Sequence, residues 1–183
     1  GNQDNQGSEP GTMGDNLPSL SLGTGRTAAR ISAGKELTCA VLDDASIKCW
    51  GDNSSGQLGQ GKDRNEGWAV HGVTPAHMGD NLPPVAVRKN PAWVAVSAGH
   101  QTVCAQAKDH SVQCWGRNQF GQLGLGDRRN RGARPEDMTN LWPIDLGDGV
   151  GIRAVVTGVD HTCVLTLDQS VRCWGRNTTG ALG

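Results

Sequence analysis

The sequence contains very few of the large aromatic side chains that usually fill a hydrophobic core. Among 183 residues there are one Phe and no Tyr, whereas glycine occurs 27 times. A single compact core built around aromatic rings is therefore excluded, and the chain must rely on backbone pairing, small residues and closely packed layers. No apolar run approaches the roughly 20 residues of a membrane-spanning helix. The net charge of −1 gives no overall attraction to nucleic acid or to an anionic membrane.

A local catalytic motif is missing as well. The sequence has no Ser/His/Asp set, no paired carboxylates and no phosphate-binding loop. His100, His110 and His161 lie near expected strands, but their only notable neighbours are Asp109 and Asp160. We therefore predict that the protein is not an enzyme and holds no cofactor, although a site assembled from distant residues would leave no local motif.

The dominant feature of the sequence is a phrase that occurs three times. It reads Cys-x9-Cys-Trp-Gly-x-Asn-x-x-Gly-x-Leu-Gly, and its copies span 39–59, 104–124 and 163–183. The similarity extends upstream to Met-Gly-Asp-Asn-Leu-Pro at 13–18 and 78–83, with a looser version at 138–143. Self-similarity of this kind indicates a repeat architecture. The expected repeat units are 1–59, 60–124 and 125–183.

Each unit has the pattern of short β-strands. A run rich in Ile, Val and Ala is followed by two further runs joined by a short polar turn, which is typical of a hairpin. The expected strands are 29–33, 38–42 and 47–50, then 94–98, 103–107 and 112–115, then 154–157, 162–167 and 171–174. A fourth extended piece begins at a proline in each unit, at 18–22, 83–87 and 143–146, as an edge strand can. The sequence therefore predicts an all-β fold of three consecutive four-stranded antiparallel blades, which form part of one propeller domain.

The six cysteines form one pair per unit, and the members of a pair lie on the two arms of an expected hairpin. Directly opposed residues on antiparallel strands have Cα atoms about 4.5 Å apart, within reach of a disulfide. We predict the disulfides Cys39–Cys49, Cys104–Cys114 and Cys163–Cys173. Free buried thiols are the alternative, and a zinc site is disfavoured because nine intervening residues is not a zinc-ligand spacing. Disulfides imply an oxidising compartment, so we expect a secreted, cell-surface or periplasmic protein.

The repeated phrase resembles the regulator of chromosome condensation repeat. The match is close over 31–61 and 96–126, where Ala-Gly precedes the first Cys, and residues 161–165 read His-Thr-Cys-Val-Leu. The resemblance implies one propeller blade per repeat, in rings that usually have seven blades. In this family the nuclear founder is a nucleotide-exchange factor that binds chromatin, a bacterial relative inhibits β-lactamases, and other members are extracellular binding domains. The matching residues are framework positions, so the resemblance implies the fold and not an activity.

Three blades are too few to close such a ring, and open sheet edges invite pairing with other chains. One expectation is that the 183 residues belong to a longer chain that completes the ring. The alternative is that copies associate, with two chains supplying six blades. The balanced charge and the paired cysteines argue against chromatin as a partner, so we expect a protein partner and no nucleic acid.

Several loop residues are candidates for modification or binding. Asn53 and Asn177 begin Asn-Ser-Ser and Asn-Thr-Thr, which are N-glycosylation sequons, although Asn at this position also belongs to the repeat framework. Four arginines cluster between the second and third blades and mark a charged contact or a solvated loop: Arg128, Arg129, Arg131 and Arg134. Trp68, Trp93 and Trp142 are expected in loops, as binding anchors or as plugs between blades. The acidic residues near Asp145 lack the spacing of a calcium loop, and no metal site is predicted.

These features favour a non-catalytic, secreted module for protein interaction or adhesion. The first alternative is a structural subunit of an extracellular filament, sheath or cell-wall assembly, and the second is a propeller that acts as an enzyme inhibitor. The classes differ in what the variable loops at 60–78 and 125–138 contact, which is another protein or another copy.

Overall fold

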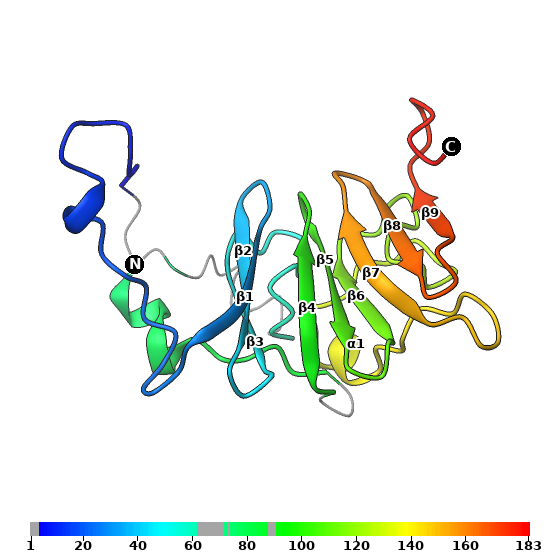
Figure 1. Cartoon of the computed structure of the whole chain (residues 1–183), viewed down its shortest axis with the longest axis horizontal. Coiled ribbons are helices and arrows are strands. Elements are labelled where there is room, and N and C mark those ends of the chain that lie inside the picture. The colour runs from blue at the N-terminus through cyan, green and yellow to red at the C-terminus, as the bar shows by residue number, and fades with distance from the viewer. Residues whose placement is uncertain (1–3, 62–71, 73, 88–90) are drawn as a thin grey trace.

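The chain folds into three small antiparallel sheets that lie side by side (Figure 1). The computed structural model describes residues 4–61, 72, 74–87 and 91–183. Sheet 1 contains β1 (Ala28–Ala33), β2 (Leu37–Leu42) and β3 (Ile47–Gly51). Sheet 2 contains β4 (Trp93–Ala98), β5 (Thr102–Ala107) and β6 (Val112–Gly116), and sheet 3 contains β7 (Ile152–Thr157), β8 (His161–Thr166) and β9 (Val171–Gly175). The all-β prediction is confirmed, with no closed ring among the described residues.

Short helical turns occupy part of the connections. They are the 3-10 helices η1 (Gly14–Asn16), η3 (Pro75–His77) and η4 (Gly79–Asn81), and the α-helix α1 (Pro135–Thr139). Within the described ranges, no helix has the length and apolar character required to cross a membrane.

In each sheet a disulfide joins the middle strand to the third strand. The register places Cys39 opposite Cys49, Cys104 opposite Cys114, and Cys163 opposite Cys173. The Cα atoms of each pair are 4.1 Å apart, and all three disulfides are formed as predicted, with no free cysteine. Each sheet is therefore crosslinked within a hairpin and does not depend on a distant residue for this restraint.

The turn that joins the two disulfide-linked strands is built in the same way in sheets 1 and 2. Ser46 donates to Asp44 Oδ1 through both its backbone N–H, at 3.0 Å, and its hydroxyl, at 2.6 Å. These hydrogen bonds lower the pKa of the Asp44 carboxyl. Asp109 and Ser111 repeat the arrangement in sheet 2. An Asp side chain that accepts the backbone N–H two residues later stabilises a tight turn. This is the physical reason for the polar turn predicted from the sequence.

The predicted fourth strand is wrong in two respects. Segments 18–22, 83–87 and 143–146 are not strands, because their prolines lack the N–H groups that a ladder needs. Segments 83–87 and 143–146 also join the sheet of the preceding unit. Val85 N donates to Ile47 O in sheet 1, and Ile144 N donates to Val112 O in sheet 2, both at 2.8 Å. The outer edge of sheets 1 and 2 is thus covered by the following repeat.

The hydrophobic core lies between adjacent sheets. One buried cluster joins sheets 1 and 2, and a second joins sheets 2 and 3. Trp93 is part of the first cluster, at 2% exposure, with its ring centroid 6.5 Å from that of Trp115. Its placement in a loop is therefore wrong: Trp93 begins β4 and fills the space between two sheets. Trp68 lies outside the described residues.

Candidate functional site

The connection between β6 and β7 contains the arginine cluster and α1, and it forms a basic cavity. The cavity has a volume of about 380 Å³. Its lining residues are Ser55, Gln119, Arg128, Arg129, Asn130, Ala133, Arg134 and Asp137. We call it the arginine cavity. The lining combines residues of the third-unit loop with Ser55 of the first-unit loop. The arginine cavity therefore forms only where two repeats come together.

Buried hydrogen bonds hold the loop of the arginine cavity in place. Asn118 is fully buried, and its amide nitrogen donates to the Asp127 carbonyl oxygen at 2.9 Å. The Asn118 backbone N–H donates to Asn130 Oδ1 at 2.9 Å. Gly132 lies so close to Gly56 that a Cβ atom on Gly132 would be 2.2 Å from the Gly56 carbonyl oxygen. The loop is therefore anchored at several points, which gives the arginines fixed backbone positions.

The four clustered arginines have two different roles. Arg131 is structural: its guanidinium contacts Asp127 at 2.6 Å, and its backbone pairs with Gly116 through two hydrogen bonds. Burial raises the pKa of Asp127, but the hydrogen bond and the charge of Arg131 outweigh this effect and leave that pKa below its ordinary value. The guanidinium groups of Arg128, Arg129 and Arg134 are exposed and bond to no other group in the part of the chain that the structure describes.

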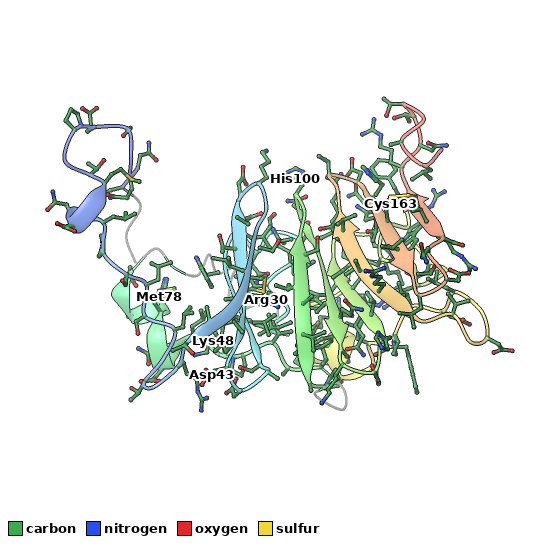
Figure 2. The ribbon with its side chains drawn as sticks, in the orientation of Figure 1. Arg30, Asp43, Lys48, Met78, His100 and Cys163 are labelled. Atoms are coloured by element: carbon green, nitrogen blue, oxygen red, sulfur yellow. A yellow bond between two sulfur atoms is a disulfide. The ribbon has the colours of Figure 1, made fainter. Side chains whose placement is uncertain are left out.

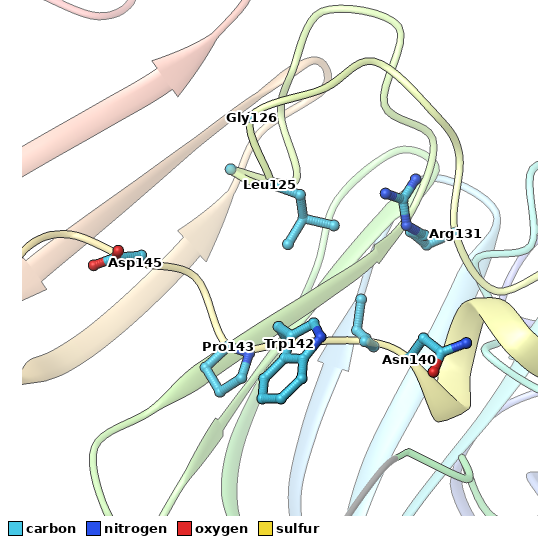
Figure 3. Close-up of a pocket in the computed structure, with 9 residues that line it drawn as sticks. Leu125, Gly126, Arg131, Asn140, Trp142, Pro143 and Asp145 are labelled. Carbon is cyan, nitrogen blue, oxygen red and sulfur yellow. The ribbon is translucent and has the colours of Figure 1, made fainter.

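A second cavity lies beside Trp142 (Figure 3). It has a volume of about 420 Å³, with Arg131 and Leu125 on one side and Trp142 and Pro143 on the other. Trp142 itself is 58% exposed, as expected for a loop anchor. Because Ile144 and Val85 make equivalent bonds, Trp142 corresponds to Pro83 of the preceding unit. The indole is therefore not required by the repeat framework.

A third, shallow cavity of about 560 Å³ lies where the inner strands end. Its lining includes Lys35 and His100, whose Nζ and Nε2 atoms are 3.4 Å apart, and no carboxylate. His100 stands at the end of β4 in Figure 2. Across the described residues, no group of His, Cys, Asp or Glu is arranged to hold a metal ion.

The two sequon asparagines act in the repeat framework. Asn53 Oδ1 accepts the Leu58 backbone N–H at 3.0 Å, and Asn177 Oδ1 accepts that of Leu182 at 3.0 Å. Asn118, which has no sequon, makes the same bond to Leu123 at 2.9 Å. The same hydrogen bond therefore explains why an asparagine occupies this position in all three units. Glycosylation of Asn53 and Asn177 stays a prediction.

Repeated disulfide-linked hairpins, packed sheet on sheet, define a propeller-type repeat protein. Models of the "Regulator of chromosome condensation (RCC1) repeat" match residues 28–57, 93–122 and 152–181, and also 48–106 and 109–165. The chain belongs to the RCC1 repeat family.

Known relatives differ widely in size and role. Human HERC6, a probable E3 ubiquitin-protein ligase, is 31% identical over 83% of this chain, which covers 13% of HERC6. The ultraviolet-B receptor UVR8 of Arabidopsis thaliana is 28% identical over 84% of this chain and is covered to 30%. The solved structure of Prp20p from Saccharomyces cerevisiae has a TM-score of 0.66 at 22% identity, over 91% of this chain and 34% of Prp20p. The chain thus spans about a third or less of these proteins, and the structural likeness shows the fold.

The sequence named all four arginines but could not separate the anchoring Arg131 from the other three. It also missed the contributions of Ser55, Gln119 and Asp137 to the arginine cavity. Ser55 belongs to the sequon loop of the first unit, so no local pattern connects it with residues 128–134.

Proposed function

We propose that the chain is a non-catalytic protein-binding module, and that its arginine cavity holds an acidic segment of a partner protein. The observation that carries this proposal is the set of three exposed guanidiniums, Arg128, Arg129 and Arg134, around one cavity, none of which donates a hydrogen bond to a described residue. Propellers of the RCC1 repeat family are generally binding modules, which supports the same class of function.

The chemistry of the cavity favours carboxylates as ligands. A guanidinium presents planar N–H groups that match a carboxylate in a two-bond geometry. Asp137 also lines the cavity, but its Oδ2 accepts the Arg134 backbone N–H at 3.1 Å. The overall charge of −1 favours a local acidic contact over binding to a long polyanion such as nucleic acid. An acidic peptide segment is therefore the proposed occupant.

A direct binding measurement tests this proposal. A short fluorescein-labelled peptide of alternating Asp and Ser is titrated with the full chain, and its anisotropy is followed. The double variant Arg128→Glu/Arg129→Glu should bind at least about tenfold more weakly, because each charge-assisted hydrogen bond contributes roughly 1.5–3 kcal/mol. Added salt should weaken the wild-type complex.

The matched control is Arg30→Glu/Arg153→Glu, which reverses the same number of charges at exposed positions of β1 and β7. Its affinity should stay close to that of the wild type. Equal loss in both double variants would mean that the peptide responds only to net charge, and the assignment to the arginine cavity would be wrong. The variant Trp142→Ala reports whether the bound segment extends to the neighbouring cavity.

We also propose that the protein is secreted or exposed on a cell surface, with the periplasm as the bacterial equivalent. The support is that all six cysteines lie in disulfides within the hairpins. Such bonds form and persist in oxidising compartments. N-glycosylation at Asn177, which is exposed, belongs to the same proposal for a eukaryotic source.

Thiol labelling of protein from its natural source tests the oxidising compartment. We expect no labelling by a maleimide before reduction and six labels after reduction, measured by intact mass. Free thiols in protein that was alkylated during cell lysis would contradict secretion.

A further inference from the structure

A small cavity lies where the turn between β5 and β6 meets the chain that follows α1. Its volume is about 220 Å³, and its lining includes Pro91, Asp109 and Ser111 of the second unit with Trp142 and Pro143 of the third. We call it the turn cavity. Small-molecule sites have volumes of about 300–1,000 Å³, so the turn cavity is better matched to a single side chain.

The turn cavity belongs to the middle of the three sheets. Sheet 2 packs against sheet 1 through one buried cluster and against sheet 3 through the other. The aspartate of the hairpin turn is exposed in all three units, as Asp44, Asp109 and Asp168. Pro84, the equivalent of Pro143 between sheets 1 and 2, is exposed as well. The exposure of this turn and of the chain beside it is thus a property of the repeat.

In the first unit the same turn binds a guanidinium. Arg26 Nη1 lies 3.3 Å from Asp44 Oδ2 and 3.3 Å from Asp43 Oδ2. Asp44 Oδ1 accepts the two hydrogen bonds from Ser46 that close the turn. The turn therefore uses one carboxylate oxygen for its own backbone and leaves the other for a cation.

In the second unit a proline replaces this arginine. Pro91 stands two residues before β4, as Arg26 stands two residues before β1. Asp109 Oδ1 accepts the hydroxyl and the backbone N–H of Ser111 at 2.6 and 3.0 Å, whereas Asp109 Oδ2 makes no ion pair with a described residue. The hydrogen bonds from Ser111 lower the pKa of the Asp109 carboxyl, so the carboxylate stays ionised. The second turn thus presents the same oxygen without the arginine.

An exposed tryptophan stands beside this carboxylate. Trp142 is 58% exposed and lines both the turn cavity and the neighbouring cavity of Figure 3. Its equivalent in the segment that joins sheet 1 is Pro83. The turn with its own arginine is therefore accompanied by a proline, and the turn without one by an indole. The face of an indole attracts a cation more strongly than that of tyrosine or phenylalanine.

We propose that the turn cavity binds an arginine side chain from a basic segment of a partner protein. The guanidinium of the partner donates to Asp109 Oδ2, as Arg26 does to Asp44 Oδ2, and lies against the Trp142 indole. A guanidinium can make both contacts at once, because it hydrogen-bonds in its plane and stacks through its face. This site is separate from the arginine cavity and takes a ligand of the opposite charge.

Fluorescence anisotropy of a fluorescein-labelled peptide of alternating Arg and Ser, titrated with the full chain, tests the proposal. Asp109→Asn should weaken binding at least about tenfold, because a charge-assisted hydrogen bond is lost. Trp142→Leu should weaken it about threefold or more, through loss of the cation–π contact. Both residues are exposed, so the variants should keep the wild-type melting temperature.

The matched control is Asp44→Asn. It makes the same substitution in the equivalent turn, where Arg26 already holds the carboxylate, so the arginine peptide should bind as it does to the wild type. The double variant Arg128→Glu/Arg129→Glu should not weaken binding of this peptide. That result separates the turn cavity from the arginine cavity, since either assignment can fail without the other.

A peptide with citrulline in place of each arginine tests the role of the charge. Citrulline keeps the shape of the side chain and removes its charge, so this peptide should bind at least about tenfold more weakly. Equal binding of the two peptides would mean that the cavity takes an apolar or neutral ligand, and the proposal would be wrong.

Three further results would overturn the proposal. One is a wild type that does not bind the arginine peptide at about 1 mM, where even weak contacts are populated. Another is equal loss of affinity in Asp44→Asn and Asp109→Asn, which would show a response to net charge alone. The third is a dimer of the chain that Asp109→Asn dissociates, because the arginine would then come from a second copy.

Discussion

Replacement of Gly99 by alanine is expected to destabilise the protein by roughly 3 kcal/mol, at the upper part of the range for overpacked sites. A Cβ atom on Gly99 would lie 2.3 Å from the carbonyl oxygen of Gly158, which directly follows β7 of sheet 3. The Gly99 carbonyl in turn lies 1.9 Å from the position of a Cβ atom on Gly34. The three inner strand ends therefore approach through glycine backbones, and an added methyl group must force adjacent sheets apart. Urea unfolding followed by circular dichroism measures the loss.

Gly126→Ala separates this steric effect from the general cost of losing a glycine. Gly126 has φ +74° and no atom within 4 Å of an added Cβ, so only the strain of a left-handed residue applies. That strain costs about 1–2 kcal/mol. If Gly99→Ala cost no more than Gly126→Ala, close backbone approach would not be what holds the sheets in position.

Trp115→Ala is expected to cost about 3–5 kcal/mol, the range for truncating a buried aromatic residue to alanine. The indole is fully buried, lies 6.5 Å from the ring of Trp93 and donates to the Gln57 carbonyl at 3.0 Å. Its removal leaves a cavity between sheets 1 and 2 and deprives a carbonyl of its donor. Thermal and urea unfolding should both show a large shift of the midpoint.

Trp142→Ala is the control for Trp115→Ala, since it removes the same side chain from a position that is 58% exposed. Its effect on unfolding should stay within about 0.5–1 kcal/mol, as for other surface substitutions. Similar losses for the two tryptophans would contradict the distinction between an inter-sheet tryptophan and a surface tryptophan.

The expected role of Trp93 as a plug between blades is confirmed, but its placement in a loop failed for a reason that applies to strand limits in general. The sequence placed the strand at 94–98, but it begins one residue earlier, at Trp93. Alternate residues of a strand point to opposite faces, so one residue decides which side chain enters the core. Here Trp93 is buried at 2% and Val94 is 43% exposed. An irregularity in the register between Trp93 and Ala95 adds to the ambiguity.

The arginine cavity shows how far a candidate site could be found from sequence. The cluster of arginines was visible because charge stands out in a loop. Arg131 differs in role from Arg128, Arg129 and Arg134 because it contacts Asp127 and Gly116. Buried hydrogen bonds set the positions of these two partners relative to the loop. Such partners are selected by three-dimensional geometry, and no spacing in the sequence encodes them.

The sequence by itself determined the repeat, the hairpins and the three disulfides. These features are local, because the paired cysteines are separated by 10 positions and the joining turn is closed by its own Asp and Ser residues. Only the tertiary structure decided which sheet each proline-initiated segment covers. That choice depends on the carbonyl that a neighbouring repeat presents, as Ile47 does for Val85. Contacts within a hairpin can be read from one repeat, whereas contacts between repeats require the position of the next one.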